Sequence, residues 1–295
     1  MESLSSILLF PKNNYVARIS SSSSRIYTTA ATHPWQYPIS GKLSHPYSME
    51  NARSLLELAY RVSIHNLEAQ RNDPEPIKLD PPGFDIVFPI NTVYEGQDVN
   101  VLWFFYSTTL NVIVVAFTGT YAEILAKVDR QYSQKVPESV GNYIEGMKMH
   151  GGFWSLYQQI QSKLLEELSK YTDKETQILI TGISLGGALG SIASLDLYKR
   201  KLANGVVPSN VVKYSFASPR VFNILGAQYY DHLKPVSYRI MNGSDVIPMV
   251  PLPIMPNKMD FRHVEKLIWF DVNLGNLVQN HTPAYLKYFD VQSLT

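Results

Sequence analysis

A serine stands between two glycines in the pattern Gly182-x-Ser184-x-Gly186, directly after an apolar stretch and directly before a run of small residues. A strand, a tight turn and a helix in this order form the nucleophile elbow of a serine hydrolase. Flanking side chains would collide with the strand and the helix, so glycine is needed at both positions. The start of the helix would favour a developing negative charge beside the serine. The alternative is a glycine-rich turn that only permits close packing.

Three histidines follow Ser184 and are candidates for the base that takes its proton. A serine hydroxyl needs such a base, the base needs an acidic partner, and after an elbow both follow the serine along the chain. His281 lies in a polar loop after the last predicted strand, from which its ring could reach over the sheet, so it is the predicted base. His263 stands just before a strand and could equally be structural. His232 falls in a predicted helix.

Asp245 is the predicted acidic partner. It follows the predicted strand 236–241, and the carboxyl end of that strand lies on the edge of the sheet where open α/β sheets build their sites. Asp231 and Asp260 compete, but neither directly follows a predicted strand. The alternative for Asp245 is a residue that caps a turn.

Two donors must stabilise the oxyanion that the attack creates. One is the backbone N–H of Leu185, the residue after the nucleophile. The segment Phe117-Thr-Gly-Thr120 follows an earlier predicted strand and can supply the other, because Gly119 lets the backbone approach and Thr120 offers an N–H and a hydroxyl.

Strands and helices alternate after residue 117, and these elements must position the site. Apolar residues at helical spacing predict the helices, and short β-rich runs predict the strands, of which 101–106 and 112–117 form a hairpin. The alternation predicts an α/β fold with a mostly parallel central sheet and helices on both faces. Predicted helices cover 50–70, 153–168, 188–198 and 227–233, and the other predicted strands cover 84–90, 178–181, 211–216, 236–241 and 265–272.

The composition is that of a globular chain long enough for one sizeable domain. Of its 295 residues 45% are hydrophobic and 17% are charged, and the formal net charge is +1, so no global field favours nucleic acid. The absence of cysteine excludes thiol catalysis, disulfides and cysteine-based metal sites. No apolar run approaches the roughly 20 residues of a membrane-spanning helix.

The N-terminal segment 1–48 differs from the rest, and folded structure is expected to start near Tyr47, which makes 49–295 the hydrolase domain. No acidic residue occurs between Ser3 and Met49, and serines fill 20–24. This bias is typical of an organelle transit peptide and also of a plain disordered tail. The short apolar stretch 7–10 precedes Lys12 rather than following positive charge, which argues against a secretory signal.

Read together, the motifs resemble the class 3, or fungal-type, lipases over roughly residues 85–290. The resemblance implies an α/β-hydrolase fold, hydrolysis of acyl esters without metal or organic cofactor, a triad of Ser184, Asp245 and His281, and Thr120 in the oxyanion hole. It also places His263 outside the triad. The matching segments are Phe117-Thr-Gly-Thr120, His150-Gly-Gly-Phe153, Thr181-Gly-Ile-Ser-Leu-Gly-Gly-Ala188, Ala217-Ser-Pro-Arg220, Tyr238-Arg-Ile-Met-Asn-Gly-Ser-Asp-Val-Ile-Pro248 and His281.

Two positions depart from the family pattern. Two segments beside the site each allow two interpretations. Ile183 replaces a histidine, and Thr118 stands where arginine is usual. Residues 121–149 correspond to the family's lid, and their apolar positions fit either a flap over the pocket or an ordinary packed helix. The apolar loop 247–256 lines the acyl pocket or forms a proline-stiffened strap.

The leading functional prediction is a triacylglycerol lipase or esterase that acts on a lipid or ester substrate, at a membrane or lipid-droplet surface. Phospholipase A1 or galactolipase activity would use the same machinery. A lipase-like protein without turnover, which binds lipid or a partner, is the alternative from another class. The intact set of Ser184, Asp245, His281 and Thr120 favours the enzyme.

Overall fold

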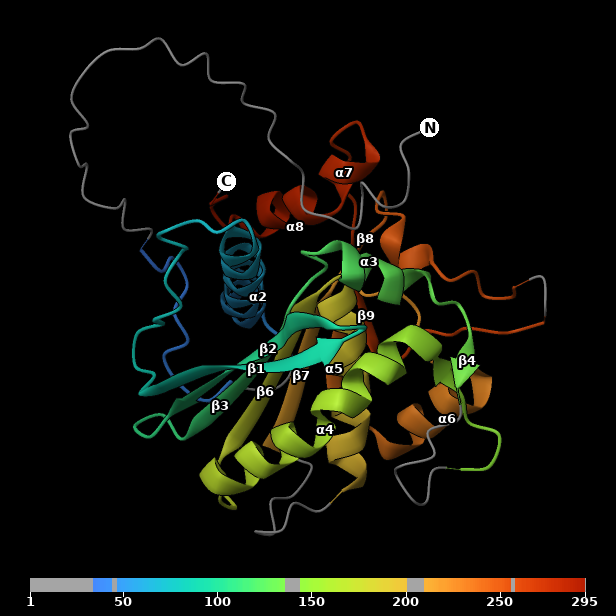
Figure 1. Cartoon of the computed structure of the whole chain (residues 1–295), viewed down its shortest axis with the longest axis horizontal. Coiled ribbons are helices and arrows are strands. Elements are labelled where there is room, and N and C mark those ends of the chain that lie inside the picture. The colour runs from blue at the N-terminus through green and yellow to red at the C-terminus, as the bar shows by residue number, and fades with distance from the viewer. Residues whose placement is uncertain (1–33, 44–46, 136–143, 201–209, 256–257, 295) are drawn as a thin grey trace.

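A computed structural model describes residues 34–43, 47–135, 144–200, 210–255 and 258–294. A seven-stranded sheet with the order β1-β2-β3-β6-β7-β8-β9 forms its centre (Figure 1). The strands are β1 (Ile86–Tyr94), β2 (Gln97–Ser107), β3 (Val112–Phe117), β6 (Gln177–Ile183), β7 (Val211–Phe216), β8 (Val236–Asn242) and β9 (Lys266–Phe270). The short strands β4 (Gln134–Lys135) and β5 (Met149–His150) pair with each other.

The sheet is antiparallel at one edge and parallel through the rest. β1, β2 and β3 pair as antiparallel neighbours, which confirms the predicted hairpin. From β3 to β9 every pair is parallel. Strands β3, β6 and β7 are buried along their whole length, because helices cover both faces of the sheet. Their sequences therefore do not alternate between polar and apolar residues. The predicted α/β fold with a mostly parallel sheet is therefore confirmed.

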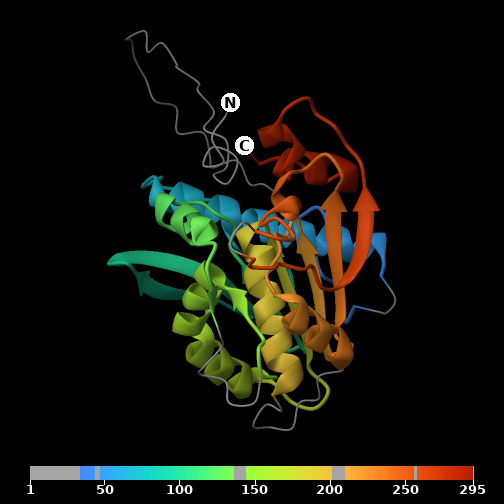
Figure 2. The ribbon, with the colours of Figure 1, turned by 90° about the vertical axis from the view of Figure 1, so that its right-hand side faces the viewer.

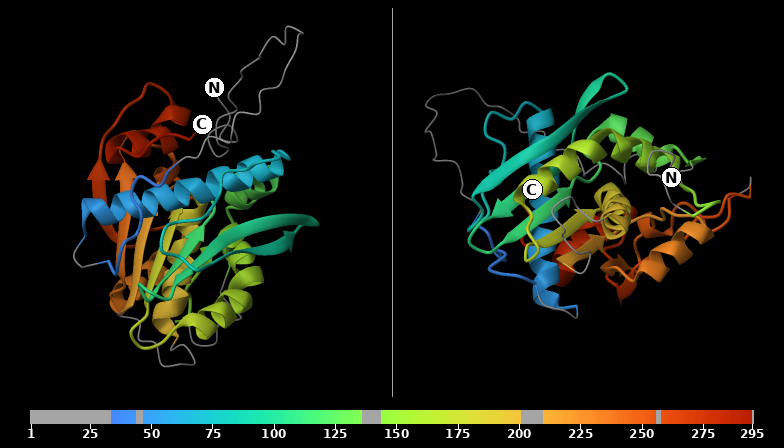
Figure 3. Two further views of the ribbon diagram at one scale, coloured as in Figure 1. Left: turned by 90° about the vertical axis from the view of Figure 1, so that its left-hand side faces the viewer. Right: turned by 90° about the horizontal axis from the view of Figure 1, so that it is seen from below.

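Two core clusters lie on opposite faces of the sheet, each between the sheet and the helices that cover that face. One cluster joins the sheet to α3 (Glu123–Arg130), α4 (Gly151–Tyr171), α5 (Leu185–Lys199) and α6 (Ile224–Leu233), and the other joins it to α2 (Met49–Gln70) and α8 (Thr282–Phe289). Figure 2 shows α5 in front of the sheet, and the opposite view in Figure 3 shows α2 in front of it. The short helices η2 (Ile247–Met249) and α7 (Leu277–Asn280) lie in loops after β8 and β9.

The packed domain begins earlier than the Tyr47 start predicted from sequence. The backbone N–H of Gln36 donates to Glu57 on α2 at 2.9 Å, the guanidinium of Arg61 lies 4.3 Å from the centre of the Trp35 ring, and Ile39 is buried. The described part of segment 1–48 is therefore folded against α2, and the prediction of a disordered or targeting segment concerns residues that lie mostly outside the described ones. None of the described helices is long and apolar enough to cross a membrane.

Candidate active site

The turn between β6 and α5 has the strained geometry predicted for an elbow. Ser184 adopts φ 58° and ψ −124°, a backbone conformation that residues other than glycine rarely take. A Cβ on Gly182 would lie 2.4 Å from the carbonyl carbon of Gly186, and one on Gly186 would lie 2.5 Å from the carbonyl oxygen of Phe117. Both glycines are thus required sterically, and the serine is held at the N-terminus of α5.

His281 and Asp245 form a buried hydrogen-bonded pair. Nδ1 of His281 lies 2.8 Å from Oδ2 of Asp245, and the other carboxylate oxygen accepts the backbone N–H of Ile247 at 3.0 Å. Asp245 is fully buried and follows β8, while His281 stands between α7 and α8. With Nδ1 directed to the carboxylate, Nε2 is the ring nitrogen left to accept a proton.

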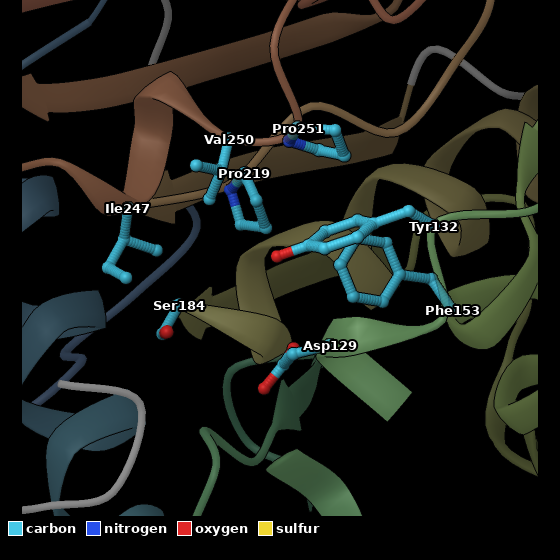
Figure 4. Close-up of a pocket in the computed structure, with 8 residues that line it drawn as sticks. All are labelled: Asp129, Tyr132, Phe153, Ser184, Pro219, Ile247, Val250 and Pro251. Carbon is cyan, nitrogen blue, oxygen red and sulfur yellow. The ribbon is translucent and has the colours of Figure 1, made fainter. Parts of the chain in front are cut away.

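Ser184 lines a pocket whose walls are mostly apolar. The lining comes from α3 and the segment after it, from α4, and from the loops that follow β7 and β8 (Figure 4). Within the described part of the chain, the Ser184 hydroxyl is buried and has no hydrogen-bond partner, so no bond joins it to His281 in this structure. The lining residues are Asp129, Tyr132, Phe153, Ser184, Pro219, Ile247, Val250 and Pro251.

Asp129 links the predicted oxyanion residue to the pocket. Oγ1 of Thr120 donates to Oδ2 of Asp129 at 2.7 Å, and both side chains are buried. Burial raises the pKa of the Asp129 carboxyl to about 7, although the Thr120 hydrogen bond and the charge of His281 act to lower it.

The two departures from the family pattern are accommodated by the local packing. Ile183 is fully buried in the cluster on the α2 side. Thr118 Oγ1 accepts a hydrogen bond of 2.9 Å from Asn66 on α2, whose amide oxygen accepts one of 3.1 Å from Trp103 Nε1. The N–H of Gly119 donates to Ser63 at 3.1 Å. Neutral hydrogen bonds from α2 therefore hold the segment that precedes Thr120.

The other candidates for the base and the acid either make hydrogen bonds that stabilise the fold or are exposed to solvent. Nε2 of His263 lies 2.7 Å from the carbonyl oxygen of Pro248, and burial, with help from nearby arginines, lowers its pKa to about 3. His263 is thus a neutral donor that ties down the loop after β8. Asp260 accepts the N–H of Ile224 at the start of α6, while Asp231 and His232 are exposed on that helix.

The segments predicted to flank the site are only partly described. The predicted inner face of α3, with Ile124, Leu125 and Val128, is buried in the cluster that also contains α4. The lid interpretation for 121–149 stays a prediction, and residues 136–143 lie outside the described ones. In the loop after β8, Ile247, Val250 and Pro251 line the pocket.

Two residues near the predicted site were not foreseen. Asp129 falls in the segment 121–149 without a predicted role of its own, and nothing in the sequence analysis assigns a role to Tyr285. The hydroxyl of Tyr285 donates to Oδ2 of Asp245 at 3.2 Å. Tyr285 lies in the first turn of α8, the helix that begins directly after His281, which is the one sequence signal that could have pointed to it.

Known proteins resemble the chain in sequence. Residues 114–255 match the family model described as lipase (class 3). A secreted mono- and diacylglycerol lipase of Malassezia restricta is 30% identical over 194 residues, which are 59% of this chain and 61% of that protein. A lipase of Rhizomucor miehei is 31% identical over 140 residues, 46% of this chain and 36% of that protein. The chain thus spans less than two thirds of the length of these relatives.

Solved structures resemble the chain in fold. A lipase from Rhizopus microsporus var. chinensis has a TM-score of 0.57 at 22% identity, over 82% of this chain and 84% of that one. A mono- and diacylglycerol lipase from Aspergillus oryzae has a TM-score of 0.54 at 20% identity, over 79% and 83% of the two chains. These similarities identify the fold as an α/β-hydrolase. The family match adds to the elbow geometry and the fold: over residues 114–255 the chain is similar in sequence to the class 3 lipases.

Proposed function

We propose that this protein hydrolyses carboxylic esters of lipids, acylglycerols first among them, through an acyl intermediate on Ser184. One observation carries the proposal: a strained serine with an unpartnered hydroxyl faces an apolar pocket, and a hydrogen-bonded His281–Asp245 pair stands at the same edge of the sheet. The relatives named as mono- and diacylglycerol lipases support acylglycerols as the substrate class.

The reaction would follow the chemistry of a serine, a base and an acid. His281 Nε2 takes the proton of Ser184 as Oγ attacks the ester carbonyl carbon, and Asp245 stabilises the imidazolium through Nδ1. The tetrahedral intermediate collapses when His281 returns the proton to the leaving alcohol. Water then attacks the acyl-serine by the same route and releases the fatty acid. Because Ser184 and His281 are not bonded in the free protein, substrate binding must bring the two side chains together.

The oxyanion would accept hydrogen bonds from the backbone N–H of Leu185 and from Thr120. A hydroxyl carries one proton, so while Thr120 donates to a charged Asp129 that proton is not available to the oxyanion. A neutral Asp129 can donate to Thr120 Oγ1 instead, and Thr120 then directs its own proton to the substrate. The raised pKa of Asp129, about 7, gives the neutral form a substantial population near neutral pH.

The pocket would hold the acyl chain. The rings of Tyr132 and Phe153 and the aliphatic side chains of Ile247 and Val250 line it in Figure 4, and apart from Ser184 the polar groups of the lining are the Tyr132 hydroxyl and the Asp129 carboxyl. An apolar wall suits a hydrocarbon chain, while Ser184 at its edge meets the ester group.

Two assays on the whole chain test the proposal. We expect the wild type to react with a fluorophosphonate probe and to hydrolyse nitrophenyl esters, and Ser184→Ala to lose both reactions. The matched control is Ser169→Ala on α4, which should keep both. Full activity in Ser184→Ala would end the proposal, and a folded wild type that ignores the probe would favour a binding role without turnover.

A lipid panel then defines the substrate. We expect release of fatty acid from mono-, di- or triacylglycerols to exceed release from phospholipids and galactolipids. A preference for the last two would assign the same machinery to phospholipase A1 or galactolipase chemistry.

A further inference from the structure

One wall of the pocket carries a hydroxyl that none of the described residues engages. The ring of Tyr132 lines the pocket beside Phe153, and its hydroxyl points into the pocket toward the side on which Ser184 lies (Figure 4). No hydrogen bond joins this hydroxyl to any residue that the structure describes. A phenylalanine would offer the same ring to a hydrocarbon chain, and the hydroxyl of a tyrosine that is withdrawn from water usually has a partner. The hydroxyl of Tyr132 is therefore available to a ligand.

Backbone contacts hold Tyr132 between α3 and α4. Its N–H donates to the carbonyl of Arg130, the last residue of α3, at 2.9 Å. The carbonyl of Ser133 accepts the N–H of Gly151, the first residue of α4, at 2.7 Å. A Cβ on Gly151 would lie 3.2 Å from that carbonyl oxygen, which shows how closely the two segments approach. Backbone packing, and not a polar partner, thus positions the Tyr132 ring.

A second unpaired donor contacts the same two rings. His150 is fully buried, its ring stacks on that of Phe153 with centroids 3.8 Å apart, and it meets the Tyr132 ring at 90° with centroids 5.8 Å apart. Its Nδ1 accepts the N–H of Phe153 at 3.4 Å, so Nε2 carries the ring proton. Within the described part of the chain Nε2 has no partner, and burial lowers the pKa of His150 to about 3, which keeps the ring neutral. Two donor hydrogens on this side of the pocket therefore lack an acceptor among the described residues.

The other polar group beside Tyr132 already has a partner. Asp129 accepts the hydroxyl of Thr120 through Oδ2 at 2.7 Å. Burial, followed by the charge of Asp129, raises the pKa of the Tyr132 phenol, so this hydroxyl stays protonated at any working pH. A donor that loses water without gaining an acceptor is costly, so a ligand that covers this wall binds best when it brings an acceptor of its own.

We propose that the Tyr132 hydroxyl donates a hydrogen bond to an oxygen atom on the acyl chain, so that the pocket prefers an oxygenated acyl group, such as a keto fatty acyl ester, to a plain hydrocarbon chain. The proposal rests on the proposed ester hydrolysis and on the acyl chain occupying this pocket. Once a chain excludes water, a hydrocarbon leaves the hydroxyl unpaired, whereas a keto oxygen accepts its proton. A site that hydrogen-bonds its substrate rejects an analogue without the matching group far better than an apolar pocket rejects an isostere. Tyr132 is thus a specificity-determining residue.

Esters that differ by one oxygen test the proposal. The substrates are nitrophenyl esters of decanoic acid and of oxodecanoic acids with the ketone at successive carbons of the chain. We expect the wild type to favour one oxo ester over the decanoate about tenfold in kcat/KM, the effect of one hydrogen bond between neutral groups. Tyr132→Phe should remove this preference, so that the ratio of the two kcat/KM values falls to one or below.

Tyr106→Phe is the matched control for the lost hydroxyl. Tyr106 is also half-buried, and its ring packs on that of Tyr171 with centroids 5.2 Å apart. It pairs with Ile113 near the start of β3, at the edge of the sheet opposite the elbow. Tyr106→Phe should therefore keep the wild-type ratio for every oxo ester.

Binding without turnover separates this inference from the proposed function. Ser184→Ala and Ser184→Ala/Tyr132→Phe are titrated with decanoate and with each oxodecanoate by calorimetry. We expect one oxodecanoate to bind Ser184→Ala about tenfold more tightly than decanoate, and the difference to vanish in the double variant. A wild type that hydrolyses the decanoate ester but favours no oxo ester would overturn the proposal, because water alone would then satisfy the hydroxyl. So would a preference that persists in Tyr132→Phe. A wild type that cleaves none of the esters, while Ser184→Ala still shows the Tyr132-dependent binding, would contradict the hydrolysis and support the oxygen-binding role of Tyr132.

Discussion

The hydroxyl of Tyr285 lies 3.2 Å from Oδ2 of Asp245, the same oxygen that pairs with Nδ1 of His281. Tyr285 also accepts the backbone N–H of Asn242 at 2.9 Å. Burial, followed by the nearby Asp245, raises the pKa of the Tyr285 phenol well above its usual range, so it remains a donor at any working pH. The carboxylate is therefore held between a tyrosine, a histidine and the backbone of its own loop.

Replacing Tyr285 by phenylalanine should weaken catalysis without abolishing it. Tyr285→Phe removes the hydrogen bond to the charged Asp245, worth about 1.5 kcal/mol, and also the acceptor of the Asn242 N–H. We expect the loss at Asp245 to lower kcat for ester hydrolysis about tenfold with little change in KM, and the loss at Asn242 to lower stability. Tyr288→Phe, on the exposed side of the same helix, is the control. Equal kcat in wild type and Tyr285→Phe would show that the hydroxyl does not position Asp245.

The buried Asp129 carboxyl should make stability depend on pH. Its pKa rises from the ordinary value of 3.8 to about 7 on folding, so between these values the folded state holds a proton that the unfolded state has released. Stability from this group is complete below pH 3.8 and is lost as pH rises to about 7. Between pH 5 and pH 8 the loss is roughly 3 kcal/mol.

Urea unfolding of Asp129→Asn measures this contribution. The amide does not ionise, so the difference in unfolding free energy between the variant and the wild type should move in favour of the variant as pH rises from 5 to 8. Asp98→Asn, at an exposed position on β2, should track the wild type. Parallel curves for Asp129→Asn and wild type would mean that the carboxyl ionises normally in the folded protein.

Backbone strain at Ser184 predicts a difference between two inactive variants. At φ 58° and ψ −124° alanine retains the Cβ that causes strain, while glycine does not. We expect Ser184→Gly to be about 1 kcal/mol more stable than Ser184→Ala, with ester hydrolysis lost in both. Thermal unfolding compares the pair directly, and a more stable alanine variant would contradict the assignment of strain.

Local steric signals made the centre of the site predictable from sequence. Gly182 and Gly186 are needed because backbone atoms occupy the space of their missing side chains, and that need is visible in five residues. Asp245 and His281 followed from strand order. The predicted start of α5 at Ala188 lies three residues after the observed start at Leu185, because Gly186 and Gly187 have poor helix propensity and tertiary packing overrides it.

Features that depend on distant contacts could not be predicted. The segment around Trp35 has no periodic pattern, and it is fixed by Glu57 and Arg61 more than twenty residues away. Asp129 gains its raised pKa only when α3 packs on α4 and buries it. A sequence window contains neither partner, so such residues emerge only from the tertiary structure.

A buried ion pair beneath α5 illustrates the same dependence. Lys213 on β7 pairs with Glu265, which precedes β9, and both side chains are fully buried. Ser191 and Ser215 donate to Glu265 at 2.7 and 2.8 Å, and Lys213 donates to Ser191 at 3.0 Å. Burial lowers the pKa of Lys213, while the adjacent Glu265 opposes that shift.

Breaking this pair from one side should cost more than removing it entirely. Lys213→Met leaves a buried carboxylate without its cation, so we expect the free energy of unfolding to fall by about 3–5 kcal/mol at pH 7. Lys213→Met/Glu265→Leu removes both charges and should recover most of that loss, because apolar side chains fill the site without an ionic group to desolvate. Urea unfolding of wild type, both single variants and the double variant gives the four free energies of unfolding of a double-mutant cycle. A double variant as unstable as the sum of the two single losses would show that the residues act independently and that the strands are held by other contacts.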